Sequence, residues 1–368
     1  MSAPPRHRAL FGAVAAAIVT VASLAASEVV LRLVDYPPAS FSPWIRSDVF
    51  GFRLAPGISV RMRGPEYDVG VATNSLGMRD DEPAAPATRP RVLLLGDSFA
   101  MGYGVERGSI FADRLEKELS IDVVNAGTGG YEIIQQPRVL AEFAPRLHPD
   151  AVLYALYLGN DLAQNDEWEV RKDGTLHNLV REYPVRQPHE IKLVRLVRDF
   201  LYGVRKGRSE KEGEWLPFEG YLGLCERTLG PEAKKDYDDA SALLSALAET
   251  SRQLSLPLLV LMLPYRSMVE PEARASLERK IPDLAARYDL SQPARVIGER
   301  MTALGIDHID ATEFLTDEHR RTGDELFYPV DGHLTVAGHD AVARFVAPRL
   351  GELLGQRGRL RNDSHDHL

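Results

Sequence analysis

Five short strand-like runs, four of them apolar, are separated by segments of helical length, and they most constrain what this 368-residue chain can fold into. Four of the runs are 92–95, 123–124, 151–158 and 258–263, and His308-Ile309 is interpreted as a short fifth strand. Continuous apolar runs of this length are typical of strands buried on both faces of a parallel sheet. The intervening segments 110–119, 135–147, 240–254, 292–304 and 334–354 have helical spacing. The alternation predicts a doubly wound, five-stranded parallel sheet, whose ligands bind beyond the carboxyl ends of the strands.

An apolar run from Ala9 to Ala26 follows a short basic segment near the N-terminus. Its length is near the lower limit for a helix that spans a bilayer. The basic flank before it and Glu28 after it predict an inside-to-outside orientation. We interpret residues 1–35 as a retained signal-anchor helix; the alternative is a signal peptide cleaved within Ala22–Ser27, which gives a secreted protein. Both interpretations place the rest of the chain in the periplasm or otherwise outside the cytoplasm.

Composition divides the remainder of the chain. The predicted parts are a linker with a small strand-rich strap (36–90), a main domain (91–354) and a polar, disordered tail (355–368). A charged insertion at about 162–237 interrupts the strand–helix alternation and is interpreted as a cap over the site. Within it, residues 191–201 form a basic amphipathic pattern. We predict a cap helix packed on the domain; the alternative is a helix lying on an anionic membrane.

The charge balance and the single cysteine exclude several classes of protein. The net charge is −9, with a pI of about 5.7 and no basic patch, so no nucleic-acid partner is predicted. Cys225 can form neither an intramolecular disulfide nor a thiolate metal cluster, and we interpret it as a buried small apolar residue. No cofactor and no metal are predicted.

The first strand-end segment is Gly96-Asp97-Ser98-Phe99, which directly follows the first apolar run. A serine in such a strand-to-helix turn is exposed at the sheet edge, near helix N–H groups that stabilise negative charge. The triplet alone is a weak signal. It is neither a phosphate-binding P-loop nor the Gly-x-Ser-x-Gly elbow.

Two further segments follow the second and third runs. Glycine-rich Asn125–Gly130 allows backbone N–H groups to approach a substrate, and the Asn160 amide in Gly159-Asn160-Asp161 can donate to an oxyanion. Taken singly, each is equally a turn or a helix cap.

The fourth segment, Asp331-Gly332-His333, directly precedes the last predicted helix. A histidine base needs an acceptor that fixes its tautomer, and Asp331 can supply one from the same loop. An Asp-x-His pair could also be half of a metal site, but no second ligand pair supports that hypothesis. His339 is interpreted as a surface or packing residue. Tyr265 and Arg266, after the fourth run, could line the site.

These residues together resemble the SGNH (GDSL-like) hydrolase family. The resemblance is carried by Gly96-Asp97-Ser98, Gly130, Asn160, Asp331 and His333, and it covers residues 91–354 apart from the insertion. The segment Asn74–Arg79 and the N-terminal helix resemble the membrane-anchored, exported branch of that family. The resemblance implies a flavodoxin-like SGNH hydrolase fold.

The resemblance also implies roles for the site residues. Ser98 would be the nucleophile and His333 its base, while the N–H groups of Ser98 and Gly130 and the Asn160 side chain would form the oxyanion hole. Asp97 would shape the serine turn. The family places its acid three residues before the histidine, where this chain has Val330. The Asp-x-His spacing resembles relatives that O-acetylate alginate. A further departure is that the glycine before Asn160 is displaced by one position.

Three functions follow as hypotheses. The first is an exported serine esterase that acts on acyl esters of an envelope glycan or lipid, tethered to the membrane by its N-terminal helix. The alternative is an O-acyltransferase that uses the same residues on an envelope polysaccharide. The third is a catalytically silent glycan-binding scaffold, against which the joint presence of Ser98, Asn160 and His333 argues.

Overall fold

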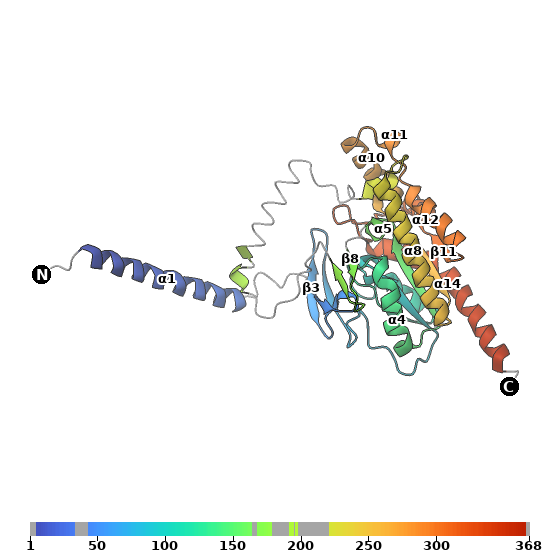
Figure 1. The fold of residues 1–368 in the computed structure, drawn as a ribbon, viewed down its shortest axis with the longest axis horizontal. Helices are drawn as coiled ribbons and strands as arrows, with labels where there is room; N and C mark the ends of the chain where they lie inside the picture. Colours follow the sequence, from blue (N-terminus) through green and yellow to red (C-terminus); the bar gives the residue numbers. More distant parts are fainter. Residues whose placement is uncertain are drawn as a thin grey trace. The chain divides into compact units, whose positions relative to one another are not determined.

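The computed structural model describes residues 5–33, 43–163, 168–178, 191–194, 196–197 and 221–365. The chain divides into two compact units. One unit comprises residues 1–42 and 186–216, and the other comprises residues 43–185 and 217–368 (Figure 1).

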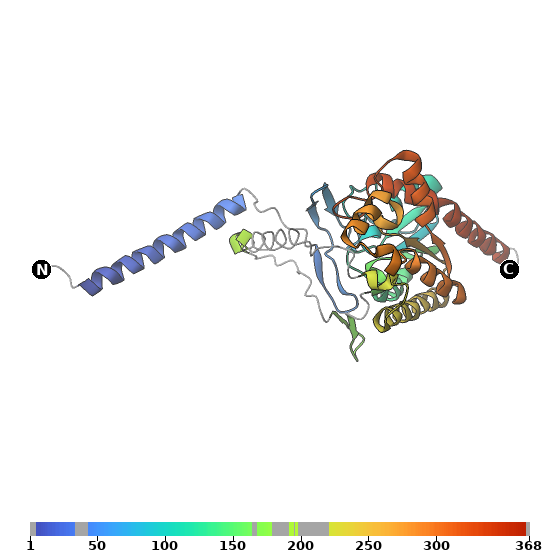
Figure 2. The same ribbon diagram turned by 90° about the horizontal axis from the view of Figure 1, so that it is seen from above.

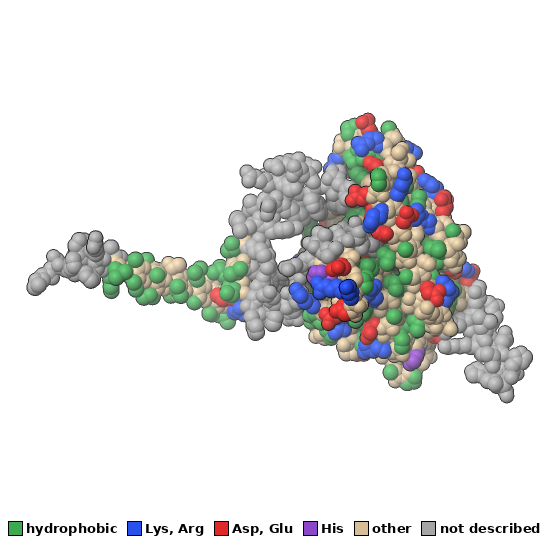
Figure 3. All heavy atoms as spheres, in the orientation of Figure 1, with side chains coloured by type: hydrophobic (Ala, Val, Ile, Leu, Met, Phe, Trp, Pro, Cys, Tyr) green, Lys and Arg blue, Asp and Glu red, His purple; other side chains and the backbone are tan. Residues whose placement is uncertain are grey.

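The smaller unit is built on helix α1 (Pro5–Leu33), whose segment Leu10–Leu33 is long and apolar enough to cross a membrane. Hydrophobic side chains cover the face of α1 that Figure 3 shows. A signal sequence has the same properties, so retention of the helix stays a prediction. The carboxylate of Glu28 accepts hydrogen bonds from the N–H groups of Lys192 and Leu193, at 3.1 and 2.9 Å. The described residues of the predicted basic helix, 191–194 and 196–197, therefore belong to the unit of α1. The others lie outside the described residues.

The larger unit contains the predicted five-stranded parallel sheet. Its strands are β5 (Arg91–Gly96), β6 (Asp122–Asn125), β7 (Ala151–Tyr157), β10 (Leu258–Leu263) and β11 (Asp307–Asp310). Their order is β11-β10-β7-β5-β6, and every neighbouring pair is parallel. All residues of β5 and β7 are buried, which explains the uninterrupted apolar runs 92–95 and 151–158. The predicted doubly wound, flavodoxin-like sheet is confirmed.

Helices enclose the sheet between them (Figures 1 and 2). The long helices are α3 (Phe111–Leu119), α4 (Gln136–Leu147), α8 (Pro231–Gln253), α12 (Gln292–Ala303) and α14 (Val336–His365). Helix α3 packs against α14, while α8 packs against both α4 and α12. Helices α4, α8 and α12 each carry a proline in their first two positions, where its missing N–H costs nothing.

Several elements differ from the sequence-based expectation. Helix α8 begins at Pro231, so the last part of the predicted insertion belongs to this helix. Helix α14 continues to His365, through residues expected to be disordered. Helix α13 (Thr312–Thr322) was not predicted, since its sequence is mostly polar. The remaining helical elements are α2 (Ser98–Met101), η1 (Ile133–Gln135), α5 (Asn160–Ala163), α7 (Leu222–Cys225), α9 (Arg266–Val269), α10 (Pro271–Lys280) and α11 (Leu284–Arg287).

The predicted strap consists of two antiparallel hairpins. Strand β1 (Trp44–Ser47) pairs with β2 (Gly51–Leu54), and β3 (Ser59–Arg63) pairs with β4 (Asp68–Ala72). A third hairpin, β8 (Trp168–Val170) with β9 (Leu176–Asn178), is the described beginning of the insertion. Trp168 stacks on Phe52 with ring centroids 6.0 Å apart, and the Tyr131 hydroxyl donates to the Phe52 carbonyl at 2.9 Å. Aromatic packing thus joins strap, insertion and sheet domain.

A buried guanidinium joins the strap to the loop that follows Ser98. Arg79 is 1% exposed, and its terminal nitrogens donate to four backbone carbonyls. The acceptors are Gly70, Met101, Gly102 and Val105, at 2.5–3.2 Å. Burial lowers the pKa of Arg79 to about 10, so the side chain stays charged at neutral pH. Four charge-assisted bonds offset the cost of burying this charge.

We expect Arg79→Met to lower the free energy of unfolding by about 3 kcal/mol, because several buried carbonyls lose their donor. Urea unfolding followed by circular dichroism measures the change. The matched control is Arg61→Met, which removes an exposed arginine of the same strap and should leave the unfolding midpoint almost unchanged. Equal midpoints for the two variants would contradict the role assigned to Arg79.

Candidate active site

Ser98 is the first residue of α2 and follows β5 with only Asp97 between them. The Asp97 carboxylate caps α2 by accepting a hydrogen bond from the Phe99 N–H at 2.8 Å. Gly102, in a left-handed conformation with φ of 78°, ends the helix after one turn. The turn leaves Ser98 half-buried at the carboxyl edge of the sheet, while its neighbours Asp97 and Phe99 are buried.

His333 joins Ser98 and Asp331, although it lies 235 residues after the serine. Its Nε2 atom lies 2.8 Å from Ser98 Oγ, and its Nδ1 atom lies 2.5 Å from Asp331 Oδ1. Gly332, with φ of 86°, turns the chain so that the aspartate and histidine side chains meet. The Tyr328 N–H donates to the His333 carbonyl and closes the loop. The structure therefore brings the predicted nucleophile, base and orienting acid into one hydrogen-bonded line.

Side chains from α9 and the loop after it hold the His333 loop in place. The Glu270 carboxylate is 1% exposed and accepts hydrogen bonds from the Leu326 and Phe327 N–H groups, at 3.0 and 3.1 Å. Arg266 pairs with Glu270 at 2.6 Å and donates to the Pro329 carbonyl at 3.0 Å. Arg266 thus supports the loop that carries the histidine, a role that its position after the fourth strand did not specify.

Two aromatic rings contact the imidazole. Tyr103 stacks on His333 with centroids 4.5 Å apart and an interplanar angle of 28°, and Phe99 lies at 5.0 Å. Both rings come from α2 and the loop after it, the segment that carries Ser98. The contacts restrict rotation of the imidazole, so that Nε2 stays directed at the serine. Sequence reasoning missed Tyr103, because an aromatic residue in a loop carries no periodic signal.

The surroundings of three carboxyl groups shift their pKa values in different directions. Burial raises the pKa of Asp331, but hydrogen bonds and charge from His333, with a hydrogen bond from Tyr67, outweigh it and hold the pKa below its usual value. Burial raises the pKa of Asp97 well above its usual range. Burial and the neighbouring Asp97 charge raise the pKa of Asp161 further. Of the three, Asp331 is therefore the group suited to orient and stabilise a charged imidazole at neutral pH.

The loops after β6 and β7 approach the serine turn. A Cβ atom on Gly127 would lie 2.6 Å from the Met101 nitrogen, so only glycine allows this close approach to α2. A Cβ atom on Gly129 would lie 3.7 Å from Ser98 Cβ. Gly130 has a φ of 85°, and Asn160 begins α5, with its Nδ2 atom 3.0 Å from Asp161 Oδ1. The oxyanion roles of Gly130 and Asn160 stay predictions.

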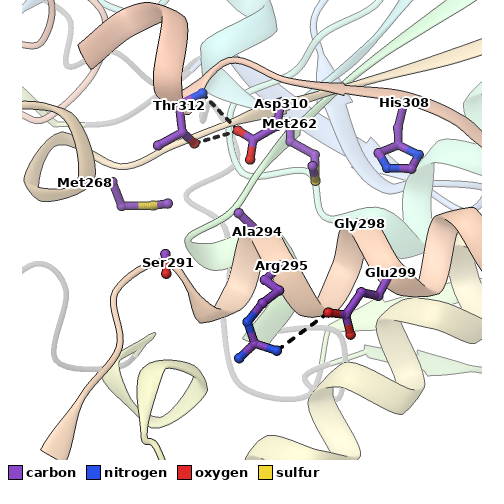
Figure 4. Close-up of a pocket in the computed structure, with 10 residues that line it drawn as sticks. All are labelled: Met262, Met268, Ser291, Ala294, Arg295, Gly298, Glu299, His308, Asp310 and Thr312. Carbon is purple, nitrogen blue, oxygen red and sulfur yellow. Dashed lines mark hydrogen bonds and ion pairs between the residues drawn. The ribbon is translucent and has the colours of Figure 1, made fainter. Parts of the chain in front are cut away.

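A cavity of about 460 Å³ lies at the ends of β10 and β11, beside α12 (Figure 4). It is lined by Met262, Met268, Ser291, Ala294, Arg295, Gly298, Glu299, His308, Asp310 and Thr312. The Asp310 carboxylate accepts both the N–H and the hydroxyl of Thr312, while Arg295 pairs with Glu299. These polar groups serve a helix start and a surface ion pair, and no predicted site residue lines the cavity.

Cys225 is buried, as predicted, and its Sγ atom lies 3.2 Å from the Tyr265 hydroxyl. Burial raises the pKa of the thiol to about 11, which leaves it protonated. Tyr265, considered as a site-lining residue from its position, is itself buried and donates to the Leu290 carbonyl. Within the described ranges, no group of three or more His, Cys, Asp or Glu side chains could hold a metal ion.

Residues 225–362 match the family model described as "SGNH hydrolase-like domain, acetyltransferase AlgX". Over these residues the chain is similar to an SGNH hydrolase-like domain. The predicted resemblance is confirmed, and the matched residues include Asp331 and His333 but begin after Ser98. None of the curated proteins matches the chain.

Three of the solved structures that match the chain are as follows. An acetyl xylan esterase, AlAXEase, is 13% identical, with a TM-score of 0.40 over 69% of this chain and 96% of its own. TesA is 16% identical, with a TM-score of 0.39 over 72% and 99%. A catalytic mutant of an acetylxylan esterase from Geobacillus stearothermophilus is 15% identical, with a TM-score of 0.38 over 73% and 95%.

His339, interpreted as a surface or packing residue, is a buried packing residue of α14. It is 1% exposed and stacks on Phe111 with centroids 5.8 Å apart. Its Nδ1 atom accepts the Phe111 N–H at 3.3 Å. Burial is the main cause that lowers its pKa to about 3, with the charges of Arg79, His333 and Arg114 acting in the same direction. The folded protein therefore keeps this imidazole neutral.

This depressed pKa predicts a loss of stability in mild acid. In the unfolded state His339 binds a proton below about pH 6.5, whereas in the folded state it binds one only below about pH 3. Between pH 6.5 and 5, wild type should lose about 2 kcal/mol of stability relative to His339→Gln, whose amide oxygen can still accept the Phe111 N–H. Urea unfolding of both proteins across this range measures the difference. Parallel stability curves would contradict the prediction.

Proposed function

We propose that the protein is an exported serine esterase that cleaves acyl esters through Ser98, His333 and Asp331. The observation that carries this proposal is the hydrogen-bonded line from Asp331 through His333 to Ser98. Each bond lies within the distance needed for proton transfer to a base or orientation of that base. The similarity to an SGNH hydrolase-like domain supports acyl-transfer chemistry at these three residues.

In the proposed mechanism, His333 Nε2 accepts the Ser98 hydroxyl proton as Oγ attacks the ester carbonyl carbon. The carbonyl oxygen becomes an oxyanion. It is stabilised by the N–H groups of Ser98 and Gly130 and by the Asn160 amide, and each donor lowers the barrier by about 3 kcal/mol. The tetrahedral intermediate collapses as His333 returns the proton to the leaving alcohol. Water then attacks the acyl-enzyme with His333 as base, and the acid is released as the acyl–Oγ bond breaks and His333 returns the proton to Ser98. Asp331 stabilises the transient imidazolium.

The apolar helix α1 supports export of this activity. A helix of this length and composition either anchors the chain in a membrane or directs its secretion. We propose the anchored form, with the SGNH-like domain in the periplasm or otherwise outside the cytoplasm. Its substrates would then be acyl esters of envelope glycans or lipids.

Ser98→Ala should abolish covalent labelling by a fluorophosphonate probe and lower p-nitrophenyl acetate turnover at least about 1,000-fold, because the nucleophile is lost. Detergent-solubilised full-length chain is used, and labelling is read by gel fluorescence. The matched control is Ser109→Ala, which removes a half-buried serine hydroxyl outside the proposed machinery. A folded wild type that neither labels nor turns over ester would instead favour the silent glycan-binding scaffold.

A second candidate, O-acyltransfer to an envelope polysaccharide, uses the same three residues. Two observations favour it: the matched family model is described by an acetyltransferase, and the acid lies two residues before the histidine. The chemistry differs only in the second step. A sugar hydroxyl, in place of water, attacks the acyl-enzyme.

Product partition separates these two candidates. With p-nitrophenyl acetate as donor and deacetylated alginate as acceptor, we expect one acetate for each nitrophenol, because water is the acceptor in the proposed esterase. Acetate is measured enzymatically, and acetyl groups on the recovered polymer are measured by NMR. Acetylated polymer that accumulates with wild type, but not with Ser98→Ala, would instead establish the transferase.

A further inference from the structure

We propose that Tyr67 is a positioning residue that extends the catalytic line to Tyr67–Asp331–His333–Ser98. Tyr67 lies in the strap, directly before β4 and outside the matched family segment. The inference rests on the proposed serine chemistry and adds a residue that acts through Asp331. It also gives the strap a role in catalysis besides its packing on the domain.

The two oxygens of the Asp331 carboxylate have different partners. Oδ1 lies 2.5 Å from His333 Nδ1, and Oδ2 accepts the Tyr67 hydroxyl at 2.8 Å. With both oxygens bonded, the carboxylate cannot rotate about its terminal bond without losing a partner. The Asp331 side chain is only 18% exposed, so water replaces a lost bond poorly. Tyr67 therefore fixes the direction from which Asp331 meets the imidazole.

The neighbouring residue Glu66 holds the backbone of the same acid. Its carboxylate accepts the Asp331 N–H at 2.8 Å and the Val330 N–H at 3.1 Å. Two adjacent strap residues thus bind the side chain and the main chain of Asp331, although they precede it by more than 260 residues in the sequence. This arrangement provides external support for an acid in a short Asp-Gly-His turn.

The Tyr67 ring is itself held by the segment that follows the nucleophile. It makes an edge contact with Tyr103 at 5.9 Å and lies 5.3 Å from Tyr328, measured between ring centroids. A Cβ atom on Gly104 would lie 2.8 Å from the Tyr328 ring and 3.1 Å from the Tyr67 ring, and the φ of 84° also favours glycine there. Tyr103 in turn stacks on His333. One aromatic cluster therefore spans the strap, the serine loop and the histidine loop.

The charged and titratable groups around Asp331 keep Tyr67 a donor. Those that face Asp331 are His333 and Tyr328 from its own loop, Tyr67 and Glu66 from the strap, and Tyr103 from the serine loop. Burial, with the nearby Tyr103 and the Asp331 charge, raises the pKa of Tyr67 far above its usual value. The hydroxyl therefore stays protonated and donates to the ionised carboxylate. A hydrogen bond to the charged form favours that form.

The test is Tyr67→Phe in the full-length chain, because it removes the hydroxyl and keeps the ring. We expect kcat for p-nitrophenyl acetate to fall about 10-fold, with KM changed less than about twofold, since the hydroxyl acts on the relay and not on substrate binding. Without its donor the carboxylate attracts a proton more strongly, so the Asp331–His333 pair takes up its proton at higher pH. The acid limb of kcat/KM should accordingly move to higher pH by about half a unit.

The matched control is Asp68→Asn, which changes an exposed residue of the same hairpin that pairs with Arg61 and Arg63. This variant should have the wild-type kcat, and the acid limb of its kcat/KM profile should lie at the wild-type pH. A Tyr67→Phe protein with wild-type kcat and an unmoved acid limb overturns the inference. A fall in kcat with an unmoved limb, matched by a similar loss of thermal stability, also overturns it, because that pattern indicates a structural role.

A second readout separates this inference from the proposed function. Proton uptake by the Asp331–His333 pair is followed by NMR of 13C-labelled histidine, with the His333 signal assigned as the one missing from His333→Gln. The midpoint should move to higher pH in Tyr67→Phe, whether or not wild type turns over ester. An unchanged midpoint overturns the positioning role, while absent fluorophosphonate labelling of wild type overturns only the proposed function.

Discussion

The reversal of strand order beside β5 is the constraint on which the rest of the structure depends. Strand β5 has β6 on one side and β7 on the other, and all three run parallel. Parallel neighbours require crossover connections, so the chain leaves β5 and β7 in different directions at their carboxyl ends. Ser98 and Asn160 begin the short helices α2 and α5 that follow these two strands. The backbone topology therefore selects this sheet edge for the proposed chemistry.

Long-range side-chain contacts to the backbone hold the His333 loop at this edge. Glu270 accepts two N–H groups at the start of the loop, and Glu66 accepts two at its centre. A buried or half-buried carboxylate is costly without donors, and backbone N–H groups supply them here. Phe99 and Tyr103 add ring contacts to the imidazole from the serine side. Ser98 and His333 thus meet because separate contacts support the serine turn and the His333 loop.

The acidic residues near the serine differ in role because they differ in environment. Asp97 accepts the Phe99 N–H and Asp161 accepts the Tyr157 N–H, but both carboxyl groups are buried, and burial raises the pKa of each despite these hydrogen bonds. Asp331 has two strong side-chain donors, and these outweigh burial and lower its pKa. The same side-chain chemistry gives two structural acids and one acid suited to orient a base.

The sequence by itself determined the five strands, the strand-end positions of Ser98, Gly130 and Asn160, and the local Asp331–His333 pair. Buried strands and the turns after them leave a local signal, because continuous apolar runs end in glycine and polar residues. Only the tertiary structure decided that Arg79 binds the loop after Ser98, that Tyr103 stacks on His333, and that Tyr67 and Glu66 bind Asp331. These contacts join residues far apart in the chain and follow no period. They exist only once packing has brought strap and domain together.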